Sequence, residues 1–320
     1  MPKIAISCYL DNKPKYLLQC RNWLMSMKWL TTPARADIVI HYNPALSTDY
    51  VSFFEWMGAK MIPTPGFGSE RGNDIFCNKI QQLFSAKIKR YDYVILSDLD
   101  IVFLDCPTTL IDAERILGKA AFSPEVEINH LLSILAELDI PVPSTMAKSE
   151  FSNIPDIIPT HFNGGLYVIP GRYIDQFAGS WAKWANFWLT KPDILGDALF
   201  TSDEHAFGTA LLETGLPYGR LPIGANFHTN IGVEKAKRFR PHKLTSLHYH
   251  SMINDYGFLA TKGIDWIDKH IIAVNKRVKF ALDVHLNGFA KVQQFLTPSK
   301  IERNDWKRPH LPEKKKHELS

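Results

Sequence analysis

Apolar and polar positions follow two different periods along the first third of the chain. Four short apolar runs have the length and composition of strands: residues 3–10, 37–41, 60–62 and 93–96. Three segments between them place apolar side chains at helical spacing: residues 16–29, 53–57 and 75–87. Strands that alternate with helices build a sheet whose two faces are both covered. The sequence therefore predicts an α/β fold with a doubly wound, mostly parallel, Rossmann-like sheet.

The rest of the chain continues this pattern less regularly. A proline-rich segment over residues 123–160 predicts a long excursion over the surface, with one short helix near 129–138. Further elements follow it: an apolar run at 165–170, helices at 173–189 and 202–214, and a helical pair over 266–295. We expect three parts: a main domain over 1–260, a C-terminal helical extension over 261–300, and a basic, unfolded tail over 301–320.

Composition and charge are those of a globular protein. The 320 residues are 45% apolar and 22% charged, and the net charge is +4. Residues 303–320 carry +3 of that charge, so the rest of the chain has no broad basic face. No RNA-binding or zinc-finger motif occurs either, which argues against a nucleic-acid partner. The basic tail, which contains Trp306, leaves a peripheral contact with an anionic membrane open.

The cysteines and the N-terminus indicate the compartment. The four cysteines have no CxxC spacing and lie in or beside apolar segments, which predicts free, buried thiols in a reducing environment. The first residues contain too short an apolar stretch for a signal peptide, and no run of about 18 apolar residues occurs. We therefore expect a cytoplasmic protein.

The most informative motif follows the apolar run at 93–96. Residues 93–104 read YVILSDLDIVFL, so the triplet Asp98, Leu99, Asp100 follows a buried strand, at the edge where parallel sheets bind ligands. In an extended segment Asp98 and Asp100 point to one side. Two carboxylates on one side form a hard-oxygen site for Mg²⁺ or Mn²⁺, and such an ion binds diphosphates. The alternative is a loop of solvated acids, because the DxD pattern is short.

Two further motifs place polar groups at element ends. In HFNGGLYVIP, Gly164 and Gly165 enter a strand and let the backbone approach a ligand, while Asn163 can hydrogen-bond to substrate hydroxyls. A plain turn is the alternative. Asp203 and Glu204 begin a helix, where acids favour the helix dipole. The functional interpretation is that one of these carboxylates faces the reacting centre.

Three other patterns are weaker. In LHYHSM, an extended stretch places His248 and His250 on one face, where one imidazole completes a metal site begun by two carboxylates; a core histidine is the ordinary alternative. Asn78 and Lys79 precede the acidic triplet and are candidates to reach a nucleotide, although such a lysine is ordinarily at the surface. One aromatic stripe favours core packing over sugar stacking: Trp181, Trp184 and Trp188.

Together these motifs resemble the GT-A class of nucleotide-sugar-dependent glycosyltransferases, most closely the glycogenin and bacterial lipopolysaccharide galactosyltransferase group. The resemblance covers residues 3–255 and implies transfer from a nucleotide-diphosphate sugar, expected to be a UDP-sugar, to a glycan or glycolipid acceptor. It also implies Mn²⁺ or Mg²⁺ as cofactor. The group's HxxGxxKPW stretch does not follow His250, so its phosphate-binding lysine is missing at that place. Retention or inversion of the anomeric centre stays open.

The resemblance implies a role for each site residue and makes residues 1–260 the catalytic domain. Three would bind the metal: Asp98, Asp100 and His250, with His248 as the less favoured third ligand. Four would bind the nucleotide sugar: Tyr9 against the base, Asn78, Lys79, and Asp98 at the ribose. Three would line the acceptor side: Asn163, Gly164 and Gly165. Two match the acidic position next to the anomeric carbon: Asp203 and Glu204.

Two other interpretations of the same residues stay open. Phosphohydrolases of the haloacid dehalogenase type carry hydrophobic-DxDx[TV], and residues 98–102 fit this pattern with Asp98 as the nucleophile. That strand usually opens its domain, however, whereas three predicted strands precede it here. A catalytically inactive carbohydrate-binding module would keep the fold and lose the metal. Nucleotidyltransferases are disfavoured because their GxGxR loop is absent after the first strand.

Overall fold

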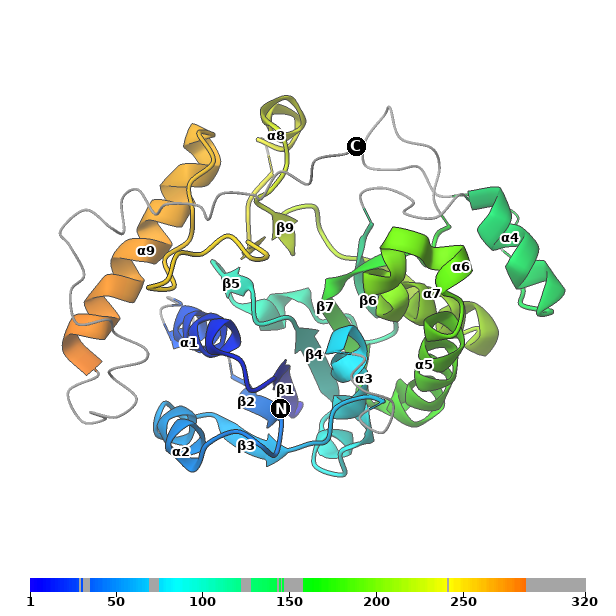
Figure 1. Cartoon of the computed structure of the whole chain (residues 1–320), viewed down its shortest axis with the longest axis horizontal. Helices are drawn as coiled ribbons and strands as arrows, with labels where there is room; N and C mark the ends of the chain where they lie inside the picture. The colour runs from blue at the N-terminus through cyan, green and yellow to red at the C-terminus, as the bar shows by residue number, and fades with distance from the viewer. Residues whose placement is uncertain are drawn as a thin grey trace.

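A seven-stranded sheet forms the centre of the protein (Figure 1). The computed structural model describes residues 1–28, 30, 35–68, 75–121, 128–142, 144, 146, 158–240 and 242–285. The strand order is β3-β2-β1-β4-β7-β6-β8. The strands span these residues: β1 Ile4–Leu10, β2 Asp37–Tyr42, β3 Lys60–Pro63, β4 Tyr93–Ser97, β6 Ile116–Ala120, β7 Phe162–Pro170 and β8 Tyr218–Arg220. Strand β7 runs antiparallel to β4 and β6, and the other pairs are parallel. The predicted α/β class and mostly parallel sheet are confirmed.

Helices cover both faces of this sheet because its central strands are apolar on both sides. In β4, Ile95 packs into one core cluster, whereas Val94 and Leu96 pack into the other. The first cluster takes helices α1 (Pro14–Lys28), α2 (Thr48–Trp56), α8 (Val233–Phe239) and α9 (Asp265–His285). The second takes α3 (Asn78–Gln81), α4 (Ile128–Glu137), α5 (Ile174–Leu189), α6 (Pro192–Leu195) and α7 (Ser202–Thr214). Figure 1 shows α1 and α9 on one side of the sheet, and α5 and α7 on the other.

A second, three-stranded sheet begins directly after the acidic triplet. It consists of β5 (Ile101–Phe103), β10 (Ser246–His248) and β9 (Phe227–His228), in that order. The backbone N–H of Asp98 donates to the Gly165 carbonyl of the large sheet at 2.8 Å, and the Tyr249 N–H donates to the Asp100 carbonyl at 3.0 Å. The triplet therefore bridges the two sheets, and the apolar run after it belongs to the smaller one.

One predicted helical region is wrong in detail. The single helix expected over 75–87 is replaced by α3 flanked by short 3₁₀ turns, and it stops at Ser85, which is extended with ψ 124°. Other 3₁₀ turns occupy Pro107–Leu110, Gly171–Tyr173 and Gly196–Thr201. Over the expected helical pair, α9 occupies the residues as far as His285. The remaining part of that pair, the basic tail and about half of the proline-rich excursion lie outside the described residues.

Several sequence predictions about packing are confirmed. The four cysteines are buried and free. The three tryptophans of α5 are buried, and Trp181 and Trp188 contact Phe207 and His205 of α7, so this stripe is part of the core. Among the described residues, no helix is both long enough and apolar enough to cross a bilayer.

Candidate active site

A cavity of about 600 Å³ opens where β1 and β4 end. The antiparallel strand β7 begins at this edge, so its first residues face the ends of its parallel neighbours. Helix α7 and the small sheet form the opposite walls. Of the site residues predicted from the sequence, all but Gly165 line this cavity. The structure therefore brings together side chains that are up to 241 positions apart, from Tyr9 to His250.

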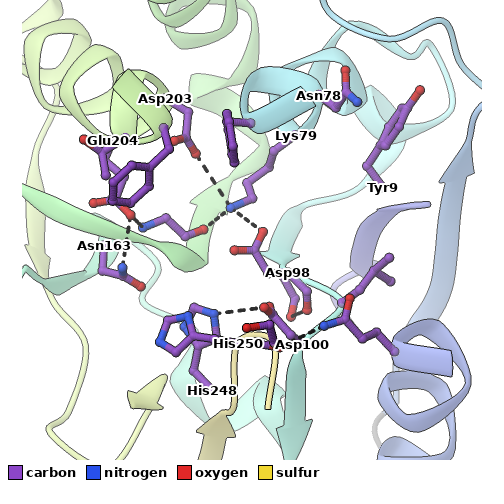
Figure 2. Close-up of a pocket in the computed structure, with 18 of the residues that line it drawn as sticks. Tyr9, Asn78, Lys79, Asp98, Asp100, Asn163, Asp203, Glu204, His248 and His250 are labelled. Atoms are coloured by element: carbon purple, nitrogen blue, oxygen red, sulfur yellow. Dashed lines mark hydrogen bonds and ion pairs between the residues drawn. The ribbon is translucent and has the colours of Figure 1, made fainter. Parts of the chain in front are cut away.

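Lys79 lies inside the cavity wall and is not the surface lysine that its position suggested. Its side chain is only 7% exposed, and Nζ lies 2.6 Å from Asp98 Oδ1 and 3.9 Å from Asp203 Oδ2. Nζ also donates a hydrogen bond to the Gly164 carbonyl (Figure 2). Burial lowers the pKa of Lys79, but Asp98, Asp203 and Glu204 outweigh burial, so the pKa is raised and the ammonium stays charged.

Asp203 titrates near neutral pH. It belongs to the first turn of α7, and its backbone carbonyl accepts a hydrogen bond from Trp181 Nε1 at 2.9 Å. Burial raises the pKa of Asp203 to about 7; Lys79 acts in the opposite direction, while Asp98 raises the pKa further. A carboxyl group whose pKa lies near the working pH is suited to proton transfer.

Glu204 has a different environment from its neighbour. Its Oε1 accepts hydrogen bonds from the Gly164 N–H at 2.7 Å and from Asn163 Nδ2 at 3.0 Å. Asn163 Oδ1 in turn accepts from Asn226 Nδ2 at 2.8 Å and from the Gly165 N–H at 3.1 Å. Glu204 and Asn163 therefore fix the start of β7, while both acids line the cavity.

Both glycines of the FNGG motif lie close to neighbouring side chains. A Cβ atom at Gly164 would lie 3.0 Å from Asp203 Oδ2 and 3.2 Å from Glu204 Oε1. At Gly165 it would lie 2.5 Å from Asn226 Oδ1 and 2.7 Å from His248 Nδ1. The predicted close approach of the backbone is present, but the groups that it approaches here are the protein's own polar side chains.

Three donor atoms suitable for a divalent ion converge at the other end of the cavity. One atom each from Asp98, Asp100 and His248 lies within 4.8 Å of the other two, and His248 Nε2 is 3.1 Å from Asp100 Oδ1. Burial raises the pKa of Asp100, but His248 and then His250 outweigh burial and hold the pKa below its usual value. Two carboxylates and one imidazole fit Mn²⁺ or Mg²⁺.

The choice between the two histidines differs from the sequence prediction. The extended stretch expected over both residues ends at His248, because His250 adopts a left-handed conformation with φ 53°. The described geometry therefore groups the carboxylates with His248. His250 lies beside it, with ring centroids 3.9 Å apart, and its Nε2 is 3.3 Å from Nδ1 of His228. Which imidazole binds a metal stays a prediction.

Tyr9 and Asn78, two of the residues predicted to bind the nucleotide, lie on the wall of the cavity near β1 and α3. The Tyr9 hydroxyl donates to the Thr64 carbonyl at 3.0 Å, and Asn78 Oδ1 accepts from the Phe67 N–H at 2.7 Å. Both side chains therefore anchor the segment after β3 while lining the cavity. Figure 2 shows them on the side of Lys79 away from Asn163, with Asp100, His248 and His250 together at the lower end.

Sequence reasoning missed His228, which also lines the cavity. It lies on β9, a strand of two residues, and pairs in register with His248 of β10. A strand this short has no periodic pattern to reveal it. Gln19 of α1 was also missed; its Nε2 donates to the His250 carbonyl at 2.9 Å.

Comparison with known proteins agrees with this geometry at the level of the fold. No protein-family model and no curated protein matches the sequence. The glycosyltransferase GlyE of Streptococcus pneumoniae TIGR4 superposes with a TM-score of 0.52 and 16% identity, covering 94% of this chain and 66% of GlyE. The apo bifunctional glycosyltransferase WbbM superposes with a TM-score of 0.50 and 12% identity, covering 86% of this chain and 52% of WbbM.

The chain has the fold of these glycosyltransferases. It spans about half the length of WbbM and just under two thirds of GlyE. The apo form of mouse xyloside xylosyltransferase 1 is also similar, with a TM-score of 0.48 and 13% identity over 77% of this chain and 97% of that one. The expected glycosyltransferase fold is therefore confirmed, whereas the glycogenin and galactosyltransferase subgroup stays a prediction.

Proposed function

We propose that this protein is a metal-dependent glycosyltransferase that moves a sugar from a nucleotide diphosphate, expected to be UDP, to a hydroxyl group of a glycan or glycolipid. One observation carries the proposal. A single cavity in a glycosyltransferase fold combines a carboxylate and imidazole donor set, a buried lysine, and a carboxyl group with a pKa of about 7. These are the groups that cleavage of a sugar diphosphate requires.

We assign one end of the cavity to the sugar donor on the basis of the charged groups that line it. Asp98, Asp100 and His248 would hold Mn²⁺ or Mg²⁺, which when bound neutralises a diphosphate and acts as a Lewis acid toward the leaving oxygen. Lys79 adds a fixed positive charge between the donor set and α7. Tyr9 lies on the wall that we assign to the base and ribose.

The acceptor end contains Asp203, Asn163 and Gly164. If the configuration inverts, ionised Asp203 accepts the proton of the acceptor hydroxyl. The hydroxyl oxygen then bonds to the anomeric carbon as the bond from that carbon to the diphosphate breaks. If it is retained, the same carboxylate stabilises an oxocarbenium-like state. In both cases Glu204 positions Gly164 and Asn163 through the hydrogen bonds of its Oε1.

Ligand-dependent thermal unfolding tests this proposal. UDP-, GDP-, CDP- and dTDP-sugars are added with Mn²⁺ or with a chelator, and one of them is expected to raise Tm only with Mn²⁺. A ligand at about 100 times its Kd stabilises by about 2.7 kcal/mol, which corresponds to a Tm rise of about 4 °C for a chain of this size. Asp100→Asn should lose this rise. Asp105→Asn is the matched control, because Asp105 follows β5 and pairs with Lys243 outside the cavity.

The other outcomes separate the alternatives. Tm rises that are equal in Mn²⁺ and chelator would contradict the metal dependence. Metal-dependent binding without sugar transfer would indicate a binding module, and release of phosphate from monoesters would indicate the phosphohydrolase. Peripheral membrane contact through residues 303–320 stays a prediction, tested by salt-sensitive liposome binding of the full chain and of the chain without this tail.

A further inference from the structure

Three histidines lie close together where the small sheet forms one wall of the cavity. His228 of β9 and His248 of β10 are register partners in a parallel pair, so their side chains leave the sheet on the same face. His250 follows two residues later. The ring centroids lie 4.9 Å apart for His228 and His248, 4.8 Å for His228 and His250, and 3.9 Å for His248 and His250. One nitrogen from each ring lies within 4.8 Å of the other two.

The backbone at His250 is held in an unfavourable conformation. Its φ of 53° is in the left-handed region, which non-glycine residues seldom adopt. The carbonyl of His250 accepts the hydrogen bond from Gln19, a residue of helix α1 that also lines the cavity. Without this turn, the strand would continue and carry the His250 ring in another direction. Such outliers, held by surrounding contacts, cluster at functional sites.

Core packing does not account for this arrangement. His228 and His248 are 7% and 4% exposed, but all three histidines line a cavity that also contains Asp98 and Asp100. Imidazole nitrogens bind Zn²⁺, Co²⁺ and related ions well, whereas Mg²⁺ prefers oxygen. The cavity therefore contains two overlapping donor sets, one rich in oxygen and one made only of nitrogen, which share His248.

We propose that His228, His248 and His250 form a nitrogen-donor site for a transition-metal ion such as Zn²⁺ or Co²⁺. The proposal deepens the proposed function, on which its biological consequence rests, because this ion would occupy the donor end of the same cavity. An ion bound by the three imidazoles uses His248, which is then not available to an ion bound by Asp98 and Asp100. Zn²⁺ is therefore expected to compete with Mn²⁺ for the protein.

Calorimetric titration of the full-length, chelator-treated protein with Zn²⁺ and with Mn²⁺ tests the site. Loss of a group that only orients a ligand already lowers metal affinity about 10–100-fold. His228→Gln is therefore expected to weaken Zn²⁺ binding at least about tenfold and Mn²⁺ binding less than about threefold. Asp98→Asn should show the reverse pattern. His242→Gln is the matched control, because His242 is exposed and does not line the cavity.

Two results would overturn the proposal. The first is a Zn²⁺ affinity of folded His228→Gln within about threefold of wild type. The second is a Co²⁺ complex of the wild-type protein with only the weak visible absorption of an ion surrounded by oxygen. If His228→Gln does not fold, the variant His250→Gln provides the same test, because His250 is partly exposed. Nucleotide-sugar binding is measured separately, so Zn²⁺ binding without it would leave this site standing and refute only the proposed transferase.

Discussion

Replacing Gly165 by alanine tests whether the close contacts at the start of β7 hold the site together. The added Cβ would lie 2.5 Å from Asn226 Oδ1 and 2.7 Å from His248 Nδ1, distances that real Cβ atoms do not show. Neither neighbour can move freely. Asn226 is fully buried and donates to Asn163, while His248 is buried and contacts Asp100. The His248 ring or β7 must therefore shift by several tenths of an ångström.

The cost of this shift follows from general experience with overpacked interiors. Extra methyl groups in a packed site cost about 1–3 kcal/mol, which lowers Tm by about 1–5 °C in a protein of this size. A displaced His248 should also weaken Mn²⁺ binding at least about tenfold, which is about 1.4 kcal/mol. Thermal unfolding and calorimetric Mn²⁺ titration measure the two effects on the same sample.

A matched control is available on helix α5. Gly179 is exposed, and a Cβ there would meet no atom within 4 Å, so Gly179→Ala should stabilise the protein by about 0.5–1 kcal/mol without changing Mn²⁺ affinity. The reasoning about Gly165 is refuted if Gly165→Ala has the wild-type Tm and binds Mn²⁺ as tightly as the wild type.

Three further predictions concern the charged side chains. The pKa of Asp203 is raised to about 7 from about 4, so the folded state binds its proton more tightly than the unfolded state does. The free energy of unfolding should therefore fall as pH rises from about 4 to about 8, by at most about 4 kcal/mol. In urea unfolding over this pH range, Asp203→Asn should lack this fall. Lys79→Met leaves Asp98 and Asp203 without their cation and should cost about 1–3 kcal/mol, because Asp98 is 36% exposed and partly solvated, whereas a loss below about 0.5 kcal/mol in the same assay would contradict the ion pair. Glu204→Gln keeps the oxygen that accepts from Gly164, so sugar transfer should fall less than about tenfold, compared with at least about a hundredfold for Asp203→Asn; equal losses would refute the division of roles.

The edge of the sheet that holds the site was predictable because its signals are local. Tyr9 and Asp98 each follow a run of apolar residues, and the ends of parallel strands meet at one edge whatever the rest of the fold does. Asp203 lies in the first turn of a helix that the sequence also predicted, so its place was predictable too. To predict where each of these residues lies, it was enough to know whether its own element is a strand or a helix and where that element begins or ends.

The environment of Lys79 was not predictable in this way. Its position before β4 is that of an ordinary surface lysine, and the groups that hold it come from β7, α7 and the turn after β4. The same limit applies to His228 and His248, which meet because two strands of two and three residues pair. The left-handed backbone at His250 was not predictable either, since HYH is typical of an extended segment and only the structure gives its φ of 53°.

The charge balance of the cavity gives an argument for metal dependence that is stronger than the DxD pattern. Among the described residues that line it, carboxylates outnumber ammonium groups: Asp11, Asp98, Asp100, Asp203 and Glu204 against Lys15 and Lys79. His250 adds no charge near neutral pH, because burial lowers its pKa to about 3. Burial is the main cause of the raised pKa of Asp203, and the negative charge of Asp98 raises that pKa further. A cavity so charged repels a diphosphate by itself. Under the proposed function, a divalent cation held by Asp98 and Asp100 would remove that repulsion, and one cavity would then serve both a phosphate donor and an ionised base.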